Sequence, residues 1–391
     1  MKKFFNEIIM FILILLLFEP NIAVKYNLFN NVFVCGSVIS FIFITMLIIR
    51  EKKTINKITL LMIIFRTLLI CTTIYNNGDI LKVGYQSIII ISLMLYAEYY
   101  YRNDKILDFI NILSNILTLY LFINIILYIL YPNGLYLARS GIHFLGIRTR
   151  FTEYSMLLLL LNIINYQLKI ENIKIFIFKM TIVLLNIFIP RIATAIIGLI
   201  IFILVYIFFK KKIKINYKLI FAVSLIITAL IVFFRIQDIF SYVIVDLLHK
   251  DLTLTGRTSI WDKSYTYIFD KFVLFGHGMK IDGNFVFWRV QLWQAHNQLL
   301  QILYEGGILG TILFYEIFFM SLAKLNHTNQ INEKIKKSIG AMFFSFGIMM
   351  ITEIYGYYLP TYILIILAYY SNKIIINNEK EELKCKKLKI E

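Results

Sequence analysis

Two polar stretches in a largely hydrocarbon sequence contain side chains that could take part in chemistry on a phosphate-linked group. The first, LTGRTSIWDKSYTYIFDKFVLFGHG at 254–278, contains Arg257, and the second, WQAHNQLLQILYEGGILGTILF at 293–314, contains His296. A guanidinium presents a rigid fork of N–H donors to phosphate oxygens and stays charged, whereas histidine titrates near working pH and suits proton transfer. A purely structural interpretation stays open, because such an arginine can be an interfacial anchor and such a histidine a hydrogen-bonded polar residue.

Further arginines occur in two other short polar segments. The stretch YPNGLYLARSGIHFLGIRTRFTEYS contains Arg139, Arg148 and Arg150, and IPRIATAIIGL contains Arg191. Clustered guanidinium groups would suit a pyrophosphate or an acidic glycan. Ordinary loop charge is the alternative interpretation of the first three, and an interfacial anchor is the alternative for Arg191.

The elements that must position these residues are membrane helices. The chain has 391 residues, of which 60% are apolar and 16% charged, and this composition lies outside the range of soluble globular domains. Apolar runs long enough to cross about 30 Å of hydrocarbon recur along it, and they predict an all-α polytopic membrane protein with about twelve transmembrane helices. The predicted spans are 5–24, 31–49, 58–75, 84–101, 106–131, 151–168, 174–190, 192–209, 218–235, 297–321, 339–356 and 358–376.

The orientation of these spans follows from the lysines and arginines of the connections, because positive residues that flank membrane helices stay in the cytoplasm. With both termini cytoplasmic, most of the 40 lysines and arginines fall on the inner side. The net charge of +17 is then mainly a topological signal, and no basic stripe interleaved with aromatic residues indicates nucleic acid as a partner. The first run lacks a small-x-small cleavage site, so it is interpreted as an uncleaved helix rather than a signal peptide.

The spans divide the chain into four parts. Residues 1–235 form an N-terminal bundle of nine spans, 236–296 a large extracytoplasmic loop, 297–376 three C-terminal spans, and 377–391 a cytoplasmic tail. In the loop, apolar spacing predicts amphipathic helices near 239–248 and at 259–272, the second with Ser259 as its N-cap. These helices could lie on the outer leaflet or pack on the bundle as a lid. Three glycines are expected to adopt positive φ or to allow close backbone approach, namely Gly256, Gly276 and Gly278.

The order of these motifs resembles the paired signature of the O-antigen ligase and polymerase superfamily. In that family a Gly-Arg-Thr/Ser-x-x-Trp helix leads to Leu-Phe-Gly-x-Gly, then to Ala-His-Asn at the start of a span with Gly-x-x-Gly after it. Here TGRTSIW, LFGHG, AHN and GILG follow in that order. The Arg-rich segment and IPRIATAIIGL occupy the places of the family's Arg-rich loop and Ser-Arg-x-x span start. Pro190 replaces the serine, and the family's Asn-Pro-Asn is absent.

The resemblance implies a GT-C-like membrane glycosyltransferase that transfers a glycan from a polyprenyl-diphosphate carrier at the outer membrane face, without a cofactor. Arg191 and Arg257 would bind the diphosphate, and His296 would act as base or orient the acceptor. Metal independence is expected because the loop aspartates form no Asp-x-Asp or Glu-x-Asp pair for a divalent ion. Substrate contacts are expected from Arg139, Arg148, Arg150, Trp261, Asn297 and Arg289.

The implied partners are an undecaprenyl-diphosphate-linked oligosaccharide, membrane lipid, and a chain-length regulator and flippase of the same pathway, all at a bacterial inner or plasma membrane. We favour a polymerase of O-antigen, capsule or exopolysaccharide. An O-antigen ligase is the first alternative. A transporter or flippase is the second, because ionisable residues such as Arg66 and Glu305 lie within spans, although no broken helix is evident in both halves.

Overall fold

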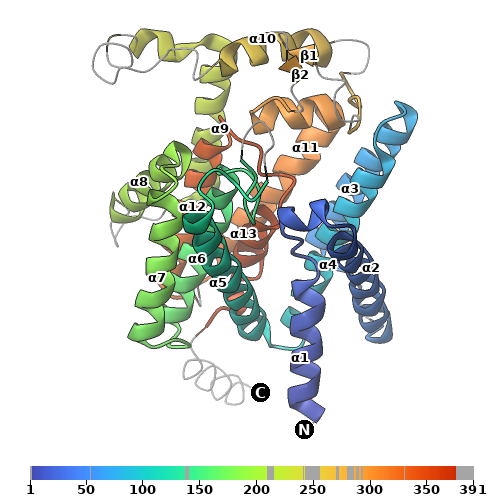
Figure 1. Cartoon of the computed structure of the whole chain (residues 1–391), viewed down its shortest axis with the longest axis vertical. Coiled ribbons are helices and arrows are strands. Elements are labelled where there is room, and N and C mark those ends of the chain that lie inside the picture. Colours follow the sequence, from blue (N-terminus) through green and yellow to red (C-terminus); the bar gives the residue numbers. More distant parts are fainter. Residues whose placement is uncertain are drawn as a thin grey trace.

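The protein is a bundle of long helices with a smaller layer of helix and loop at one end (Figure 1). The computed structural model describes residues 2–52, 54–136, 141–208, 215–240, 242, 256–269, 273–279, 286–287, 290–291, 294–329 and 331–375. Among these residues, six helices are long and apolar enough to cross a membrane, so this is a multi-pass membrane protein. They are α2 (Asn27–Arg50), α3 (Lys57–Tyr75), α4 (Ile80–Arg102), α5 (Ile106–Leu130), α9 (Tyr217–Phe234) and α11 (Gln298–His327).

Each of the twelve predicted spans overlaps one helix of the structure, while the count of twelve membrane crossings stays a prediction. The remaining members of the bundle have 11 to 18 residues. They are α1 (Lys2–Leu15), α6 (Arg150–Gln167), α7 (Ile173–Phe188), α8 (Ala193–Phe208), α12 (Glu333–Met349) and α13 (Leu359–Tyr369).

Several helices begin where the sequence offers a short polar side chain. Asn172, Asn216, Asn297 and Asn332 are N-caps whose side-chain oxygens accept hydrogen bonds from backbone N–H groups in the first turns of α7, α9, α11 and α12. Asp79 caps α4 in the same way. A cap satisfies donors that would otherwise have no partner at a helix start, so these residues fix where the chain turns back into the bundle.

Some predicted boundaries were wrong by a turn or more. The first run, predicted as a helix over 5–24, ends at Leu15, and the 3-10 helix η1 (Asn21–Lys25) follows Pro20, which has no N–H to continue an α-helix. The spans predicted at 339–356 and 358–376 are separated by an irregular connection, residues 350–358. Hydrophobicity alone does not reveal that connection, because it is itself apolar and aromatic.

The three C-terminal helices pack among the N-terminal ones rather than beside them. Helix α11 packs against α3, α9 and α13, and α12 packs against α8 and α9. A close contact allows this packing, because Gly340 on α12 faces the ring of Tyr217 on α9 and a Cβ there would lie 2.0 Å from that ring. One bundle therefore positions both halves of the chain.

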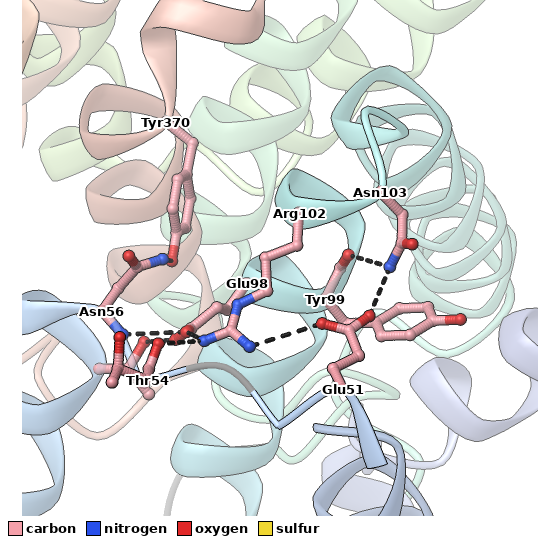
Figure 2. A network of polar contacts seen from close by, with 9 residues as sticks. Glu51, Thr54, Asn56, Glu98, Tyr99, Arg102, Asn103 and Tyr370 are labelled. Carbon is pink, nitrogen blue, oxygen red and sulfur yellow. Dashed lines mark hydrogen bonds and ion pairs between the residues drawn. The ribbon is translucent and has the colours of Figure 1, made fainter. Parts of the chain in front are cut away.

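At one end of the bundle, polar side chains tie the connections between helices together (Figure 2). Arg102 at the end of α4 pairs with Glu98 and Glu51 and donates to the carbonyl oxygen of Thr54 at 2.5 Å. Asn103 donates to Glu51 at 2.9 Å. The N-terminal part of α1 lies toward the lower end in Figure 1, and α10 (Arg257–Ile268) lies at the upper end.

The loop predicted over 236–296 contains more than helix. Besides the 3-10 helix η2 (Ile236–Phe240) and α10, it contains a two-residue antiparallel pair, β1 (Val286–Phe287) with β2 (Val290–Gln291). The helix predicted at 259–272 is α10, and its N-cap is Gly256, not Ser259, whose hydroxyl donates to the Gly256 carbonyl oxygen at 2.8 Å. The helix predicted near 239–248 falls almost entirely outside the described residues, as does the tail 377–391.

Candidate functional site

The Gly-His-Gly loop and a break in α11 hold each other in place. Helix α11 is interrupted at Gly307, whose φ of 61° and ψ of −160° are not helical. Four backbone hydrogen bonds of 2.7 to 3.1 Å join residues 273–278 to residues 304–309 across this break. The loop therefore takes up the backbone groups that a broken membrane helix would otherwise leave without partners.

The glycine prediction for this region is confirmed. Gly256, Gly276 and Gly278 have φ values of 82°, 79° and 69°. A Cβ on Gly276 would lie 2.4 Å from the backbone nitrogen of Gly307, and one on Gly278 would lie 2.4 Å from the Cα of Thr73. Both the positive φ and the close backbone approach therefore require glycine in this loop.

Helix α10 is attached to the end of α9 by polar contacts. Arg235, the left-handed C-cap of α9, pairs with Asp262 and donates to the carbonyl oxygen of Thr258 at 2.8 Å. The hydroxyl of Tyr265 donates to the carbonyl oxygen of Val232 at 2.5 Å. These contacts fix the start of α10, and Arg257 is its first residue.

Trp261 lies on the buried face of α10. Its side chain is 0% exposed and packs in a cluster with Leu300 and Tyr304 of α11 and Ile351. The Arg235 guanidinium lies 5.4 Å from the centre of its ring. Trp261 therefore anchors α10 to the bundle, and the substrate contact predicted for it from the sequence stays a prediction.

Arg257 forms an ion pair with a residue from a distant connection. Its Nη2 lies 2.7 Å from Oε1 of Glu353, in the segment 350–358 between α12 and α13. Burial raises the pKa of the Glu353 carboxyl, and the positive charges of Arg257 and Arg150 oppose that rise. The pair is only partly exposed, at 22% for the arginine side chain and 8% for the glutamate, so it is less screened than a surface pair.

Two residues next to His296 hold the connection that carries Glu353. The side-chain amide of Asn297 donates to the carbonyl oxygen of Ile351 at 2.9 Å. The side-chain oxygen of Gln298 accepts the backbone N–H groups of Tyr355 and Gly356 at 2.8 and 2.7 Å. Asn297 also caps α11, so its amide group is occupied within the protein, and the substrate contact predicted for it stays a prediction.

His296 lies directly before this cap in a strained conformation. Its φ is 50°, in the left-handed region that few residues other than glycine adopt, and its Nδ1 is buried without a hydrogen-bond partner. Burial, together with the positive charges of Arg257 and Arg150, lowers the pKa of the imidazole from an ordinary 6.5 to about 4. At neutral pH the ring is therefore uncharged and able to accept a proton.

Arg150, the first residue of α6, contacts the 350–358 connection that also carries Glu353. Its guanidinium lies 3.5 Å from the ring centre of Tyr358, and its Nη1 lies 3.6 Å from Oε1 of Glu153. Burial raises the pKa of the Tyr358 phenol to about 12, so the ring stays neutral beneath the cation. Both carboxylate oxygens of Glu153 are buried without a hydrogen-bond partner, an arrangement that a ligand donor could complete.

A cavity of about 200 Å³ lies beside Arg150. Tyrosines line it from α4, α6 and the 350–358 connection, namely Tyr85, Tyr154, Tyr357 and Tyr358. Two of its lining side chains, Glu19 and Gln86, each have a buried oxygen without a hydrogen-bond partner. Aromatic faces together with unsatisfied acceptors suit a small molecule rich in hydroxyl groups.

The comparison with known families agrees with this arrangement. Residues 175–315 match the family model described as O-Antigen ligase. The resemblance to the O-antigen ligase and polymerase superfamily is confirmed. The matched region includes Arg191, Arg257 and His296, together with the break in α11. Searches of curated proteins and of solved structures found no match.

Members of the O-antigen ligase family are membrane glycosyltransferase-like enzymes that act on lipid-linked polysaccharide. This agrees with a site in which cations, a neutral histidine and a hydroxyl-compatible cavity lie at one end of a membrane bundle. The matched region ends before α12 and begins after α6. Arg150 and Glu353 therefore lie outside the region that matches the family model.

We call Arg257, Glu353, His296, Arg150 and Glu153 the charged cluster. Four of the predicted arginines have no described contact with it. Arg148 is exposed, with its guanidinium 5.8 Å from the ring centre of Tyr128. Arg191 is exposed in the turn between α7 and α8, with a positive φ of 52°. Arg139 and Arg289 lie outside the described residues.

The sequence analysis did not predict the two acidic members of the charged cluster, Glu353 and Glu153. Glu353 lies within the span predicted at 339–356, and Glu153 lies in the segment RTRFTEYS, where the candidate residues are the arginines. The available signal was a carboxylate in an otherwise apolar run, which is costly unless it is paired. The fold shows the pairs, because they join α6, α10 and the 350–358 connection.

Proposed function

We propose that the protein is a polymerase of a surface polysaccharide, which transfers a glycan from a polyprenyl-diphosphate carrier onto another lipid-linked repeat unit at the outer face of the membrane. The observation that carries this proposal is the ion pair of Arg257 with Glu353, whose connection Asn297 and Gln298 hold next to His296. The charges of Arg257 and Arg150 also act on the His296 imidazole, so three separate parts of the chain meet there. Two guanidinium groups beside a neutral base suit a reaction in which an anion leaves while a hydroxyl loses a proton.

The proposed reaction forms one bond and breaks one. The acceptor hydroxyl oxygen attacks the anomeric carbon, the bond from that carbon to the diphosphate oxygen breaks, and the electron pair leaves with the diphosphate. Arg257 binds the diphosphate as its negative charge grows, and Arg191 is proposed as a second phosphate contact. His296 takes the hydroxyl proton, or orients the acceptor for attack.

The low pKa of His296 in the free protein is compatible with this role. Two of the causes that lower it are the cations Arg257 and Arg150, with burial as the largest. A bound diphosphate would neutralise those cations, so the part of the lowering that they cause would be removed and the pKa of the imidazole would rise when the donor is in place. The base would then become stronger in the complex, where it is needed.

Glu353 is proposed to position Arg257 before the substrate arrives. A guanidinium held by one carboxylate through Nη2 still has donors on its other nitrogens for phosphate oxygens. The pair also keeps a partly buried cation from going unpaired in the empty site. Arginines take the role of the divalent ion that many glycosyltransferases use, and this is the basis for proposing metal independence.

A ligase is the second candidate, favoured by the description of the matched family model as O-Antigen ligase. The transporter alternative has less support, because in the part of the chain that the structure describes only α11 is broken by a non-helical residue. Deleting the gene and separating the surface glycan on a gel tests these functions. Single repeat units at the surface indicate a lost polymerase, full-length chains retained on the carrier indicate a lost ligase, and an unchanged glycan contradicts both.

A further inference from the structure

A second cavity lies at the other end of the bundle, away from Arg257 and His296. Its volume is about 420 Å³, and it is lined from the start of α3, the end of α4, the end of α11 and the end of α13. It neighbours the network of Figure 2, which shares Asn56 and Tyr370 with it. The proposed glycosyl transfer does not use this cavity.

The ionisable side chains of Lys and His type that line this cavity both belong to the last turn of α11. Lys324 and His327 are exposed at its rim, and no carboxylate lines it. The nearby carboxylates Glu98 and Asp104 have cationic partners of their own, because Glu98 pairs with Arg102 and Asp104 with Lys373. In the described part of the chain, no carboxylate pairs with Lys324 or His327. The charge of Lys324 is therefore free to attract an anion.

The helix end itself would ordinarily oppose an anion, because the last carbonyl groups of a helix carry partial negative charge. Here the Nζ of Lys336 donates to the carbonyl oxygens of Asn326 and Thr328 at 3.2 and 2.8 Å. This buried ammonium satisfies carbonyls at the C-terminus of α11 and offsets their charge. The negative end of α11 is therefore offset, and Lys324 can favour an anion although the cavity lies at a helix C-terminus.

Neutral donors complete the lining. The side-chain amide of Asn372 donates to the hydroxyl of Tyr101 at 3.1 Å, which leaves the Tyr101 proton to donate elsewhere. The amide of Asn56 reaches Tyr370 at 3.2 Å, and the rings of Tyr101 and Tyr370 lie 4.4 Å apart. Tyrosines gather at the level where membrane helices meet the headgroup region, which is where a lipid phosphate would be found.

We propose that this cavity binds a phosphate group, with Lys324 and His327 as the basic contacts and amide and phenol groups as neutral donors. Basic pockets between membrane helices are known to bind the headgroups of anionic lipids. The same chemistry would accept free phosphate. The two sources are distinguishable by experiment, and neither depends on the function proposed for the other end of the bundle.

The test uses the full chain purified in detergent. Native mass spectrometry compares retention of dioleoyl phosphatidylglycerol with retention of dioleoyl phosphatidylcholine, and a thermal shift series uses inorganic phosphate alone. We expect Lys324→Gln to weaken retention of phosphatidylglycerol about fivefold, and Lys324→Gln with His327→Gln to weaken it further. The matched control is Lys334→Gln, which removes an exposed charge from the first turn of α12 without lining the cavity.

The two arms identify the source of the phosphate. Preferential retention of phosphatidylglycerol by the wild type and by Lys334→Gln, but not by the double variant, supports a lipid headgroup. A rise in melting temperature with phosphate alone, lost in the double variant while the two lipids are retained equally, supports a free phosphate-bearing solute. Equal behaviour of the wild type and the double variant in both arms overturns the proposal.

Discussion

Arg257 and Glu353 form an ion pair across 96 positions of the chain, with 2.7 Å between Nη2 and Oε1. One residue begins α10 and the other belongs to the connection that Asn297 and Gln298 hold beside His296. The pair therefore joins the loop and the C-terminal helices at the point where the reaction is proposed to occur.

The first prediction concerns the chemistry of Arg257. Arg257→Lys should lose about 10²-fold to 10³-fold in turnover, nearly as much as Arg257→Ala, because an ammonium keeps the charge but lacks the fork of donors. Turnover of a lipid-linked donor by reconstituted protein measures this. A lysine variant with close to normal turnover would show that charge alone suffices.

The second prediction concerns Glu353 as a positioning residue. Glu353→Gln should lower kcat/KM on the order of tenfold to hundredfold, because Arg257 loses its fixed position. In an Arg257→Ala background the same change should cost little, since the two residues act as a unit. Equal losses in both backgrounds would mean that Glu353 has a structural role independent of Arg257.

The third prediction concerns the pH dependence that His296 imposes. Because the pKa of the free imidazole is lowered to about 4, kcat/KM should be level from neutral pH down to about 5 and fall as pH drops through about 4. Arg150→Ala removes one of the cations that lower this pKa, so the fall should begin at a higher pH. His296→Ala should cost about 10²-fold to 10⁴-fold in turnover. An acid limb near 6.5 in the wild type would contradict this assignment.

The fourth prediction separates two neighbouring arginines. Arg150 lines the cavity and influences His296, whereas Arg148 is exposed against Tyr128. Both substitutions to alanine should raise the KM for donor, because these residues are proposed to contribute binding, and the effect of Arg150→Ala should be the larger. Unchanged KM values in both variants would mean that these arginines are ordinary charged loop residues without a role in donor binding.

The fifth prediction concerns orientation and metal. In a cysteine-free background, a cysteine at the exposed Asn133 should react with an impermeant thiol reagent in intact cells, and one at the exposed Lys334 should not. Reaction at Lys334→Cys would contradict the proposed topology.

Activity of the reconstituted protein should survive excess chelator, and loss of activity that magnesium or manganese restores would overturn the metal-independent mechanism.

The sequence by itself determined the helical membrane architecture, because each span must bury enough apolar surface within its own 17 to 25 or so residues and this requirement is visible locally. It also identified the glycines with positive φ and the two polar stretches that contain Arg257 and His296, because such residues are recognisable locally in a largely apolar sequence. Helix ends such as Leu15 and Met349 were less predictable, because capping and packing decide them.

Only the tertiary structure decided which charged residues meet. Glu353 lies in a segment that looks like an ordinary span end and Arg150 lies in a separate arginine-rich segment, and both meet Arg257 and His296 only when three connections converge at one end of the bundle. The packing of Trp261 and the capping by Asn297 likewise follow from the tertiary structure, while the substrate contacts predicted for both stay predictions. Apolar burial depends on local composition, but a partner for a buried charge is chosen by geometry between distant segments, and no single stretch of sequence contains that geometry.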